Sequence, residues 1–329
     1  MGIETDRESP SETTALVDAL AEAAARAGAA GTPPMLLVER ADVLVLRVGD
    51  VVVKAHPAET DATELLSRLR LANAPHLRDI LLPPLPIGDA LLTRHAARTI
   101  TAWPYGEPVD PDDPDAAPWE AAAMLLARLH ALPAAADLSL AAGASVARAA
   151  AHVLPEAGGP KRVRRAMRRL RAASDVVNPA AAAVVCRAFA TLPESSATAR
   201  TLVHGDFHLG QLVREPRDTA DPWRLIDIDD LGVGDPAWDL ARPAALFAAG
   251  ILEPVSWLRF LDAYRAAGGV AVPRGADEWT ALDIPARAVA VQAAALAVTA
   301  AGRERRELDD LDTALVDACR RIATASDLS

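Results

Sequence analysis

The sequence predicts an α+β protein in which a small β-rich lobe with one helix is followed by a larger α-rich lobe. Short valine-rich segments separated by turn residues fill residues 35–56, a texture typical of an antiparallel meander. After residue 118 helical patterns dominate to the end of the chain. A chain of 329 residues is long enough to give each lobe its own buried core.

The first third of the chain supplies the elements of the smaller lobe. Residues 11–29 are alanine-rich, with aliphatic side chains at helical spacing, and predict an N-terminal helix. The segments "MLLVE", "DVLVLRV" and "DVVVKAH" predict three strands, with Gly49 and Asp50 in a turn. "TDATELLSRLRLA" predicts a helix capped by Asp61, and "DILLPPLP" and "ALLTRHAARTITAW" predict further strands.

A stretch rich in proline and aspartate separates the two lobes. The segment "PYGEPVDPDDPDAAP" (104–118) is expected to contain no regular element. Beyond it "WEAAAMLLARLHAL" predicts an apolar helix, and "TLV", "QLV" and "WRLIDI" predict short strands around loops. The expected organisation is an N-terminal helical extension (1–30), a β-rich lobe (31–102), a hinge (103–109) and an α-rich lobe (110–329).

The composition argues against several classes of protein. The formal net charge is −11 and the pI about 5.1, which disfavours non-specific nucleic-acid binding and is compatible with cationic substrates. The two cysteines, Cys186 and Cys319, form no C-x-x-C pair, so neither a disulfide framework nor a cysteine zinc site is expected. The first residues lack an apolar signal core, and the apolar run 288–301 is interrupted by Gln292 and too short for a bilayer. We expect a soluble cytoplasmic protein that binds neither nucleic acid nor membrane, and the composition does not predict its oligomeric state.

Two polar clusters carry the groups that phosphoryl transfer from ATP requires. They read "HGDFHLGQ" and, about twenty residues later, "RLIDIDDLGVGDPAWDL". Phosphoryl transfer needs a carboxylate beside the acceptor hydroxyl, oxygen ligands for magnesium and a cation for the donor phosphates. Asp206 and Asp227 offer the carboxylates and Gln211 an amide oxygen, while Lys54 at the end of "VVVK" offers the cation. Together they form a complete set.

Two other phosphate chemistries are disfavoured by missing residues. "GDFHLG" resembles the opening of dinuclear metallophosphoesterase motifs, but those sites need several more histidines and none follows His208. The sequence contains no G-x-x-x-x-G-K-S/T segment, which excludes a P-loop.

"HGDFHLGQ" and "LIDIDDLGVGDPAWDLA" together resemble the aminoglycoside phosphotransferase family, which has a protein-kinase-like fold of two lobes. The likeness extends to "LLARLH" at residues 125–130 and to Lys54, and covers residues 33–322. It implies a small-molecule kinase that uses ATP and Mg²⁺ to phosphorylate a hydroxyl of an aminoglycoside, amino sugar, sugar or related metabolite. The "HLGQ" ending is more similar to the maltokinase and glucosamine-kinase branch than to the antibiotic-modifying enzymes.

The resemblance assigns a role to each central residue. It implies that Asp206 orients or deprotonates the acceptor hydroxyl and that Gln211 and Asp227 bind the metal. Lys54 would hold the α- and β-phosphates of the nucleotide.

The resemblance also implies further nucleotide-binding residues. The hinge around Ala102–Gly106, with Trp103 and Tyr105, is expected to receive adenine through backbone hydrogen bonds. Glu64 is the candidate for the kinase-type ion-pair partner of the lysine. However, Asp61-x-x-Glu64 also has the spacing of a capping box, and both readings stay open.

Four residues of the two motifs are expected to support the catalytic loop: a packed scaffold histidine, a loop-shaping histidine, a helix cap and a loop brace. They are, in that order, His204, His208, Asp235 and Asp239. Asp229 and Asp230 follow the metal-binding position and are expected to face either substrate or solvent.

The chain departs from the family pattern at two places. Gln211 stands where the family has asparagine, and its extra methylene moves the amide oxygen roughly 1.5 Å further out. The loop "ERAD" lacks the glycine that phosphate-cradling loops use for close backbone approach. These departures motivate an alternative, a catalytically weak or inactive nucleotide-binding regulatory protein of the same fold.

The basic run "KRVRRAMRRLR" (161–171) stands out in an acidic protein. Val163, Met167 and Leu170 are spaced by four and three, so they form an apolar stripe and most of the arginines fall on wet faces. A solvated helix is favoured over a surface for an anionic partner.

Overall fold

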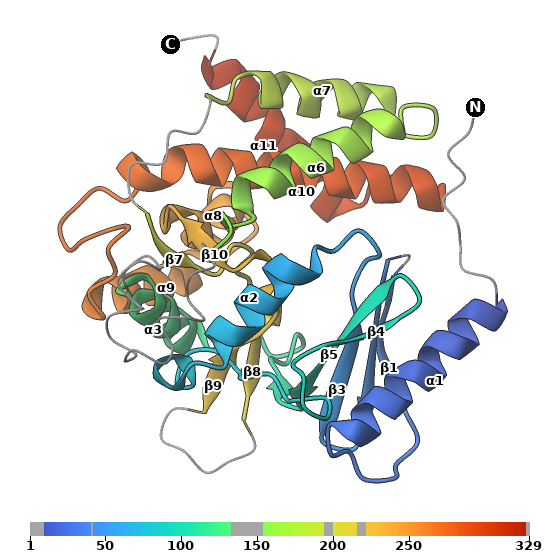
Figure 1. Cartoon of the computed structure of the whole chain (residues 1–329). Helices are drawn as coiled ribbons and strands as arrows, with labels where there is room; N and C mark the ends of the chain where they lie inside the picture. Colours follow the sequence, from blue (N-terminus) through green and yellow to red (C-terminus); the bar gives the residue numbers. More distant parts are fainter. Residues whose placement is uncertain (1–9, 41, 133–153, 194–199, 216–221, 327–329) are drawn as a thin grey trace. The chain divides into compact units, whose positions relative to one another are not determined.

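The computed structural model describes residues 10–40, 42–132, 154–193, 200–215 and 222–326. The chain divides into two compact units, each built from two stretches of sequence. Unit 1 comprises Met1–Val109 with Leu212–Ile228, and unit 2 comprises Asp110–Gln211 with Asp229–Ser329. The predicted α+β organisation is confirmed, because unit 1 carries an antiparallel sheet and unit 2 is mainly helical (Figure 1).

Unit 1 is organised around a five-stranded antiparallel sheet in the order β1-β2-β3-β5-β4. Its strands are β1 (Met35–Arg40), β2 (Val43–Val48), β3 (Val51–Ala55), β4 (Thr93–His95) and β5 (Arg98–Pro104). The predicted turn between β2 and β3 is present, and Gly49 in it has a φ of +60°, a left-handed conformation that glycine adopts without steric cost. The register places Lys54 on β3 between Val45 of β2 and Thr101 of β5.

The N-terminal helix is part of the core of unit 1. Helix α1 (Pro10–Arg26) buries Leu16, Leu20, Ala23 and Ala24 against β2, β3 and β5. The described part of the sequence expected as an extension (1–30) therefore covers one face of the sheet (Figure 1). Residues 1–9 of that expected extension lie outside the described residues.

Helix α2 (Ala62–Ala72) begins at the predicted cap. The Asp61 carboxylate accepts hydrogen bonds from the backbone amides of Thr63 (2.8 Å) and Glu64 (3.1 Å). The following segment "DILLPPLP" forms only the isolated bridges of Leu81 and Leu85 within the described residues, so the strand expected there is absent. Its prolines lack the amide protons that a strand ladder needs.

A second, three-stranded sheet of unit 1 joins distant stretches of sequence. It runs β6 (Glu107–Pro108), β8 (Leu212–Arg214) and β9 (Trp223–Leu225). Residues 212–228 thus belong to unit 1, although their position after the hinge predicts the α-rich lobe, because β8 pairs with β6 and Leu82 donates to Leu225. The expectation of no regular element in 104–118 is wrong at its start, since Pro104 ends β5 and Pro108 lies in the edge strand β6, where proline is tolerated.

Unit 2 is a helical assembly with a small two-stranded sheet. Its described helices include α3 (Trp119–His130), α6 (Gly159–Ala172), α7 (Pro179–Ala190), α8 (Ala237–Ala248), α9 (Pro254–Ala266), α10 (Trp279–Glu304) and α11 (Asp310–Ser326). Strand β7 (Thr201–Val203) pairs with β10 (Gly232–Gly234) in antiparallel register. One core cluster joins α6, α7, α10 and α11 through residues such as Met167, Val185 and Val298.

Helix α10 is the central helix of unit 2. By length and composition it could cross a membrane, but 67% of its most apolar window is buried inside the protein. It packs against α8, α6, α11 and α7. A helix that is apolar on all sides is expected at such a central position.

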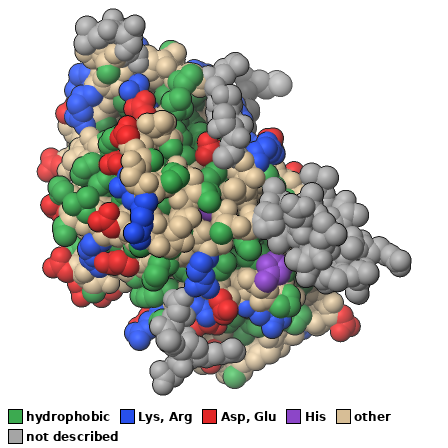
Figure 2. Space-filling model, turned by 90° about the vertical axis from the view of Figure 1, so that its left-hand side faces the viewer, with side chains coloured by type: hydrophobic (Ala, Val, Ile, Leu, Met, Phe, Trp, Pro, Cys, Tyr) green, Lys and Arg blue, Asp and Glu red, His purple; other side chains and the backbone are tan. Residues whose placement is uncertain are grey.

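The surface carries charged side chains of both signs, although the net charge is acidic. On the face drawn in Figure 2, basic and acidic side chains are interspersed with apolar ones. Six basic residues of α6 are exposed, whereas Val163, Met167 and Leu170 are buried; the exposed residues are Lys161, Arg164, Arg165, Arg168, Arg169 and Arg171. The predicted solvated face of this helix is therefore present, with the exception of Arg162, which lies in the candidate site.

Candidate active site

The loop that carries Asp206 begins with a turn that requires glycine. Strand β7 leads into His204, which is fully buried, and then into Gly205, which has a φ of +86°. A Cβ atom at Gly205 would collide with the backbone oxygen of Asp230. The glycine therefore allows the two motifs to approach closely in unit 2.

A fully buried aspartate from α8 fixes this turn. Asp239 Oδ2 accepts from the amide of His204 at 2.6 Å, and Oδ1 accepts from the amide of Gly205 at 2.8 Å. His130 Nε2 of α3 lies 2.9 Å from Asp239 Oδ2, and His130 Nδ1 lies 2.8 Å from the Tyr264 hydroxyl of α9. Burial raises the pKa of Asp239, but the hydrogen bond and charge of His130, with the other donors, outweigh it and leave the pKa below its ordinary value. The turn before Asp206 is thus held by a carboxylate.

Asp235 lies at the start of α8. Its carboxylate accepts from the backbone amide of Ala237, the first residue of α8, at 3.0 Å. Pro236 occupies the N-cap position, so Asp235 binds the helix start from one residue further out than the expected cap. Burial raises the pKa of Asp235, and the hydrogen bond from Ala237 and the charge of His130 oppose that rise. Asp235 therefore contributes to the local structure of the second motif.

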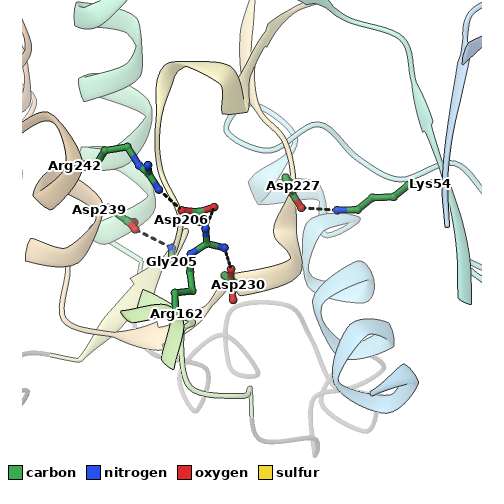
Figure 3. A network of polar contacts seen from close by, with 8 residues as sticks. All are labelled: Lys54, Arg162, Gly205, Asp206, Asp227, Asp230, Asp239 and Arg242. Carbon is green, nitrogen blue, oxygen red and sulfur yellow. Dashed lines mark hydrogen bonds and ion pairs between the residues drawn. The ribbon is translucent and has the colours of Figure 1, made fainter. Parts of the chain in front are cut away.

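Two arginines hold the Asp206 carboxylate from both sides (Figure 3). Arg162 Nη2 lies 2.7 Å from Oδ2, and Arg242 Nη2 lies 2.9 Å from Oδ1. Arg162 also pairs with Asp230, with 2.7 Å between Nη1 and Oδ2. The side chain of Asp206 is 14% exposed, so these pairs are largely shielded from solvent. Asp230 is therefore paired with this arginine, and its side chain is 15% exposed.

Neither arginine is recognisable as a site residue from the sequence alone. The basic pattern of its helix predicts a solvated position for Arg162, yet the glycines before it bring the helix start into the site. A Cβ at Gly158 would collide with Asp230, and one at Gly159 would lie 2.9 Å from the Trp238 ring. The pair of glycines ahead of the basic run is the signal that could have pointed to Arg162. For Arg242, the signal is its place three residues after Asp239, on the same side of α8.

Asp206 lies in the wall of a small pocket of unit 2. Its lining includes Arg162, Phe207, Trp238, Arg242 and Gln292. Phe207 is buried and stacks on Phe260 of α9, with 5.9 Å between ring centroids, which fixes the residue after Asp206. A larger hollow in unit 2, lined by Asn178, Arg305 and Glu307 among others, contains none of the predicted site residues.

Gln211 and His208 lie in the turn that completes the first motif. Gln211 ends the short 3-10 helix η2 (Leu209–Gln211) and is buried. Its backbone amide donates to the backbone carbonyl of His208 at 2.8 Å. A Cβ at Gly210 would lie 2.9 Å from the His208 ring, so the imidazole packs on this turn. His208 therefore contacts the backbone of its own loop.

Unit 1 brings Lys54 and Asp227 together. Lys54 Nζ lies 2.8 Å from Asp227 Oδ1, and the two side chains are 15% and 35% exposed (Figure 3). Asp227 has a φ of +60°, a left-handed conformation that a residue other than glycine adopts at some cost. A strained backbone at a charged residue is characteristic of functional sites.

The other nucleotide-binding candidates have contacts of their own in unit 1. The Glu64 carboxylate lies 3.4 Å from Arg68, and the Lys54 ammonium pairs with Asp227. Trp103 Nε1 donates to Thr101 at 3.1 Å. Tyr105 lies under the Arg47 guanidinium. The backbone amide of Tyr105 donates to the backbone carbonyl of Asp50 at 2.7 Å, so this backbone donor of the hinge is used within the fold. The structure thus has the Asp61 cap of the helix but pairs Glu64 with Arg68.

The residues proposed for a metal ion are oxygen donors. No group of three or more histidine, cysteine, aspartate or glutamate side chains suited to a metal occurs among the residues that the structure describes. Mg²⁺ is commonly held by one or two carboxylates together with substrate phosphates, so a large protein cluster is not required. The Asp227 carboxylate and the Gln211 amide fit that donor chemistry.

Solved structures share the fold of this chain. A choline/ethanolamine kinase family protein from Mesorhizobium loti is 18% identical, with a TM-score of 0.51 and coverage of 96% of this chain and 95% of that chain. A spectinomycin phosphotransferase in complex with ADP and spectinomycin is 12% identical, with a TM-score of 0.51 and coverage of 96% and 98%. A thermostable mutant of an aminoglycoside phosphotransferase is 14% identical, with a TM-score of 0.54 and coverage of 91% and 96%. These similarities show the protein-kinase-like fold.

No curated protein is significantly similar to this sequence. The model of the phosphotransferase enzyme family matches residues 38–284, a stretch that contains Lys54, both acidic motifs and the helix of Arg162. The match covers most of the chain, and the fold agrees with it. The protein belongs to the phosphotransferase enzyme family.

Proposed function

We propose that the protein transfers the γ-phosphate of ATP to a hydroxyl group of a small molecule. The observation that carries this proposal is the fixed position of Asp206, directly after a turn whose two amides are held by the buried Asp239. A carboxylate in a preorganised loop is what an acceptor hydroxyl needs. A spectinomycin phosphotransferase of similar fold was solved in complex with ADP and spectinomycin, which supports a nucleotide donor and a small-molecule acceptor here.

Asp206 acts on the acceptor. It aligns the hydroxyl so that the acceptor oxygen forms a bond to the γ-phosphorus of ATP. The bond from that phosphorus to the β,γ-bridging oxygen breaks, and its electron pair leaves with ADP. The hydroxyl proton passes to the Asp206 carboxylate.

The nucleotide-binding residues of this proposal are the ones that the family resemblance implies. Lys54 neutralises charge on the α- and β-phosphates, and Asp227 and Gln211 hold Mg²⁺, which when bound would offset the charge of the phosphate oxygens. Trp103 and Tyr105 belong to the adenine-binding hinge. Membership of the maltokinase and glucosamine-kinase branch, which the "HLGQ" ending favours, stays a prediction. A cytoplasmic location also stays a prediction.

A second candidate is a nucleotide-binding regulatory protein with little or no catalysis. The observation that favours it is that both oxygens of Asp206 are engaged by arginines, in addition to the glycine-free loop "ERAD". The two candidates share nucleotide binding and differ in phosphate transfer.

The test is an ATP-consumption screen over hydroxylated compounds with the purified protein. The variants are Asp206→Asn and, as a matched control, Asp262→Asn, whose aspartate is exposed on α9. We expect Asp206→Asn to lower turnover by on the order of 10²- to 10⁴-fold and Asp262→Asn to leave it unchanged.

Unimpaired turnover by Asp206→Asn would contradict the mechanism. Stabilisation of the wild-type protein by ATP and Mg²⁺, with no acceptor consumed across the screen, would instead identify the regulatory alternative.

A further inference from the structure

We propose that Arg162 and Arg242 form a subsite for an anionic group of the acceptor. The acceptor would then be a hydroxylated molecule that carries a carboxylate or a phosphate, and not a cationic amine. This inference rests on the proposed function, because it identifies the substrate class of the site around Asp206.

The pocket wall around Asp206 combines two cations with two carboxylates. Two guanidinium groups lie at the Asp206 carboxylate, and Asp230 contacts only one of them, Arg162. Together these four groups carry no net charge, although the protein as a whole carries −11. An ammonium group beside the reacting hydroxyl would find carboxylates whose charge the two guanidinium groups already offset, so it would gain no net attraction there.

Arg242 has a guanidinium donor that the described residues do not use. Its Nη2 donates to Asp206, whereas its Nε is buried and has no hydrogen-bond partner among the residues that the structure describes. Nε and Nη2 are the two donors on one edge of a guanidinium group, which binds carboxylate and phosphate oxygens in pairs. The Nε donor of that edge therefore lacks an acceptor among the described residues, and an anionic oxygen of the ligand would supply one.

The pocket that contains Asp206 is also lined by Gln292 and Trp238. Gln292 is the polar residue that interrupts the apolar run of α10, and its buried side chain lines this pocket together with Trp238. An amide offers both a donor and an acceptor to a hydroxylated ligand. The Trp238 ring supplies an apolar surface beside the arginines. A lining that combines polar groups with an apolar residue suits a small hydroxy acid or sugar phosphate.

The test is the binding of a matched set of ligands by calorimetry, without nucleotide. Gluconate, sorbitol and glucamine share a polyol chain and differ in one end group, a carboxylate, a hydroxymethyl or an aminomethyl group. Inorganic phosphate is the fourth probe. We expect the full-length protein to bind gluconate and phosphate at least about tenfold more tightly than glucamine, with sorbitol between them.

Variants locate the preference. Arg242→Gln should abolish it and Arg242→Lys should restore part of it, since lysine keeps the charge but lacks the paired donors. The control is Arg165→Gln, on the exposed face of α6, which should behave as the wild type. Thermal unfolding of each variant checks that it is folded.

Three results would overturn the inference: glucamine binding as tightly as gluconate, a preference that survives in Arg242→Gln, or no binding of gluconate and phosphate at millimolar concentration. Because binding is measured without ATP, these outcomes are separate from those of the turnover screen. An anion preference without ATP consumption by any acceptor would count against the proposed kinase activity and leave the subsite intact.

Discussion

The ammonium of Lys54 lies 2.8 Å from the carboxylate of Asp227, and these residues are 173 positions apart in the sequence. Both belong to unit 1, where Lys54 lies on β3 and Asp227 follows β9. The contact joins the cation and the carboxylate that the nucleotide proposal needs. Asp227 reaches it with a positive φ, so the backbone is held in an unusual conformation for this pair.

Asp227→Asn tests the metal-binding role. The neutral amide is a weaker ligand for Mg²⁺, so we expect the apparent affinity for Mg²⁺ in the presence of ATP to fall at least about tenfold. The measurement is the thermal shift caused by ATP as a function of Mg²⁺ concentration. Asp89→Asn, at an exposed position of unit 1, is the control. The same Mg²⁺ dependence in Asp227→Asn and the wild type would remove Asp227 from the metal site.

Asp239→Asn tests the brace of the catalytic loop. The asparagine loses the charge that the amides of His204 and Gly205 and the His130 ring stabilise, inside a fully buried site. We expect the free energy of unfolding to fall by about 3 kcal/mol, measured by urea denaturation. Asp262→Asn on the surface should change it by less than about 0.5 kcal/mol. An Asp239→Asn variant as stable as that control would show that the brace is not energetically important.

The pH dependence of stability follows from the lowered pKa of Asp239. Its folded-state pKa is below the ordinary value of 3.8, so the unfolded state binds the proton more readily than the folded state. The contribution is therefore complete above pH ~4 and is lost as the pH falls through the lower, folded-state pKa. We expect the stability difference between the wild type and Asp239→Asn to shrink below pH ~4. A difference that grows on acidification would reverse the assigned sign.

Gly205→Ala tests the close approach of the two motifs. The methyl group would require a left-handed alanine and would collide with the Asp230 backbone. We expect a loss of roughly 2–4 kcal/mol of stability together with the loss of turnover. Gly268→Ala is the matched control, because Gly268 has a φ of +80° with open space around it and should lose only about 1 kcal/mol. Equal losses of stability in both variants would show that the left-handed backbone conformation, and not the collision with Asp230, causes the whole effect.

The cysteines should differ in reactivity. Burial raises the pKa of Cys319 to about 12, whereas Cys186 is partly exposed. The thiolate is the reactive form, so a thiol reagent at pH ~8 should modify Cys186 in the native protein and Cys319 only after unfolding. Mass spectrometry of the labelled peptides identifies the modified residue. Fast labelling of native Cys319 would show that α11 opens readily.

Local patterns in the sequence predicted the fold class and most elements. The valine-rich segments predicted β1, β2 and β3, and Asp61 predicted the start of α2, because strand alternation and helix caps depend on neighbouring residues. The placement of residues 212–228 could not be predicted in this way. It depends on the pairing of β8 with β6, a contact between distant stretches of chain.

The site shows the same division. The motif residues Asp206 and Asp227 stand out in the sequence, but their partners do not. Arg162 belongs to a run of basic residues, and only the packing of the helix start against Asp230 and Trp238 separates it from the others. Arg242 is one arginine in an otherwise ordinary helix. Ion pairs between distant residues leave no local pattern.

The division of unit 1 into two stretches of sequence has a consequence for synthesis on the ribosome. β6 emerges first, but its hydrogen-bonded neighbour β8 emerges only after Asp110–Gln211 of unit 2. A nascent chain ending before Leu212 therefore contains Lys54 before Asp227 has been translated. Unit 1 can reach its final set of contacts only after Ile228 has been translated, so the two units complete their folding in overlapping order and not one after the other.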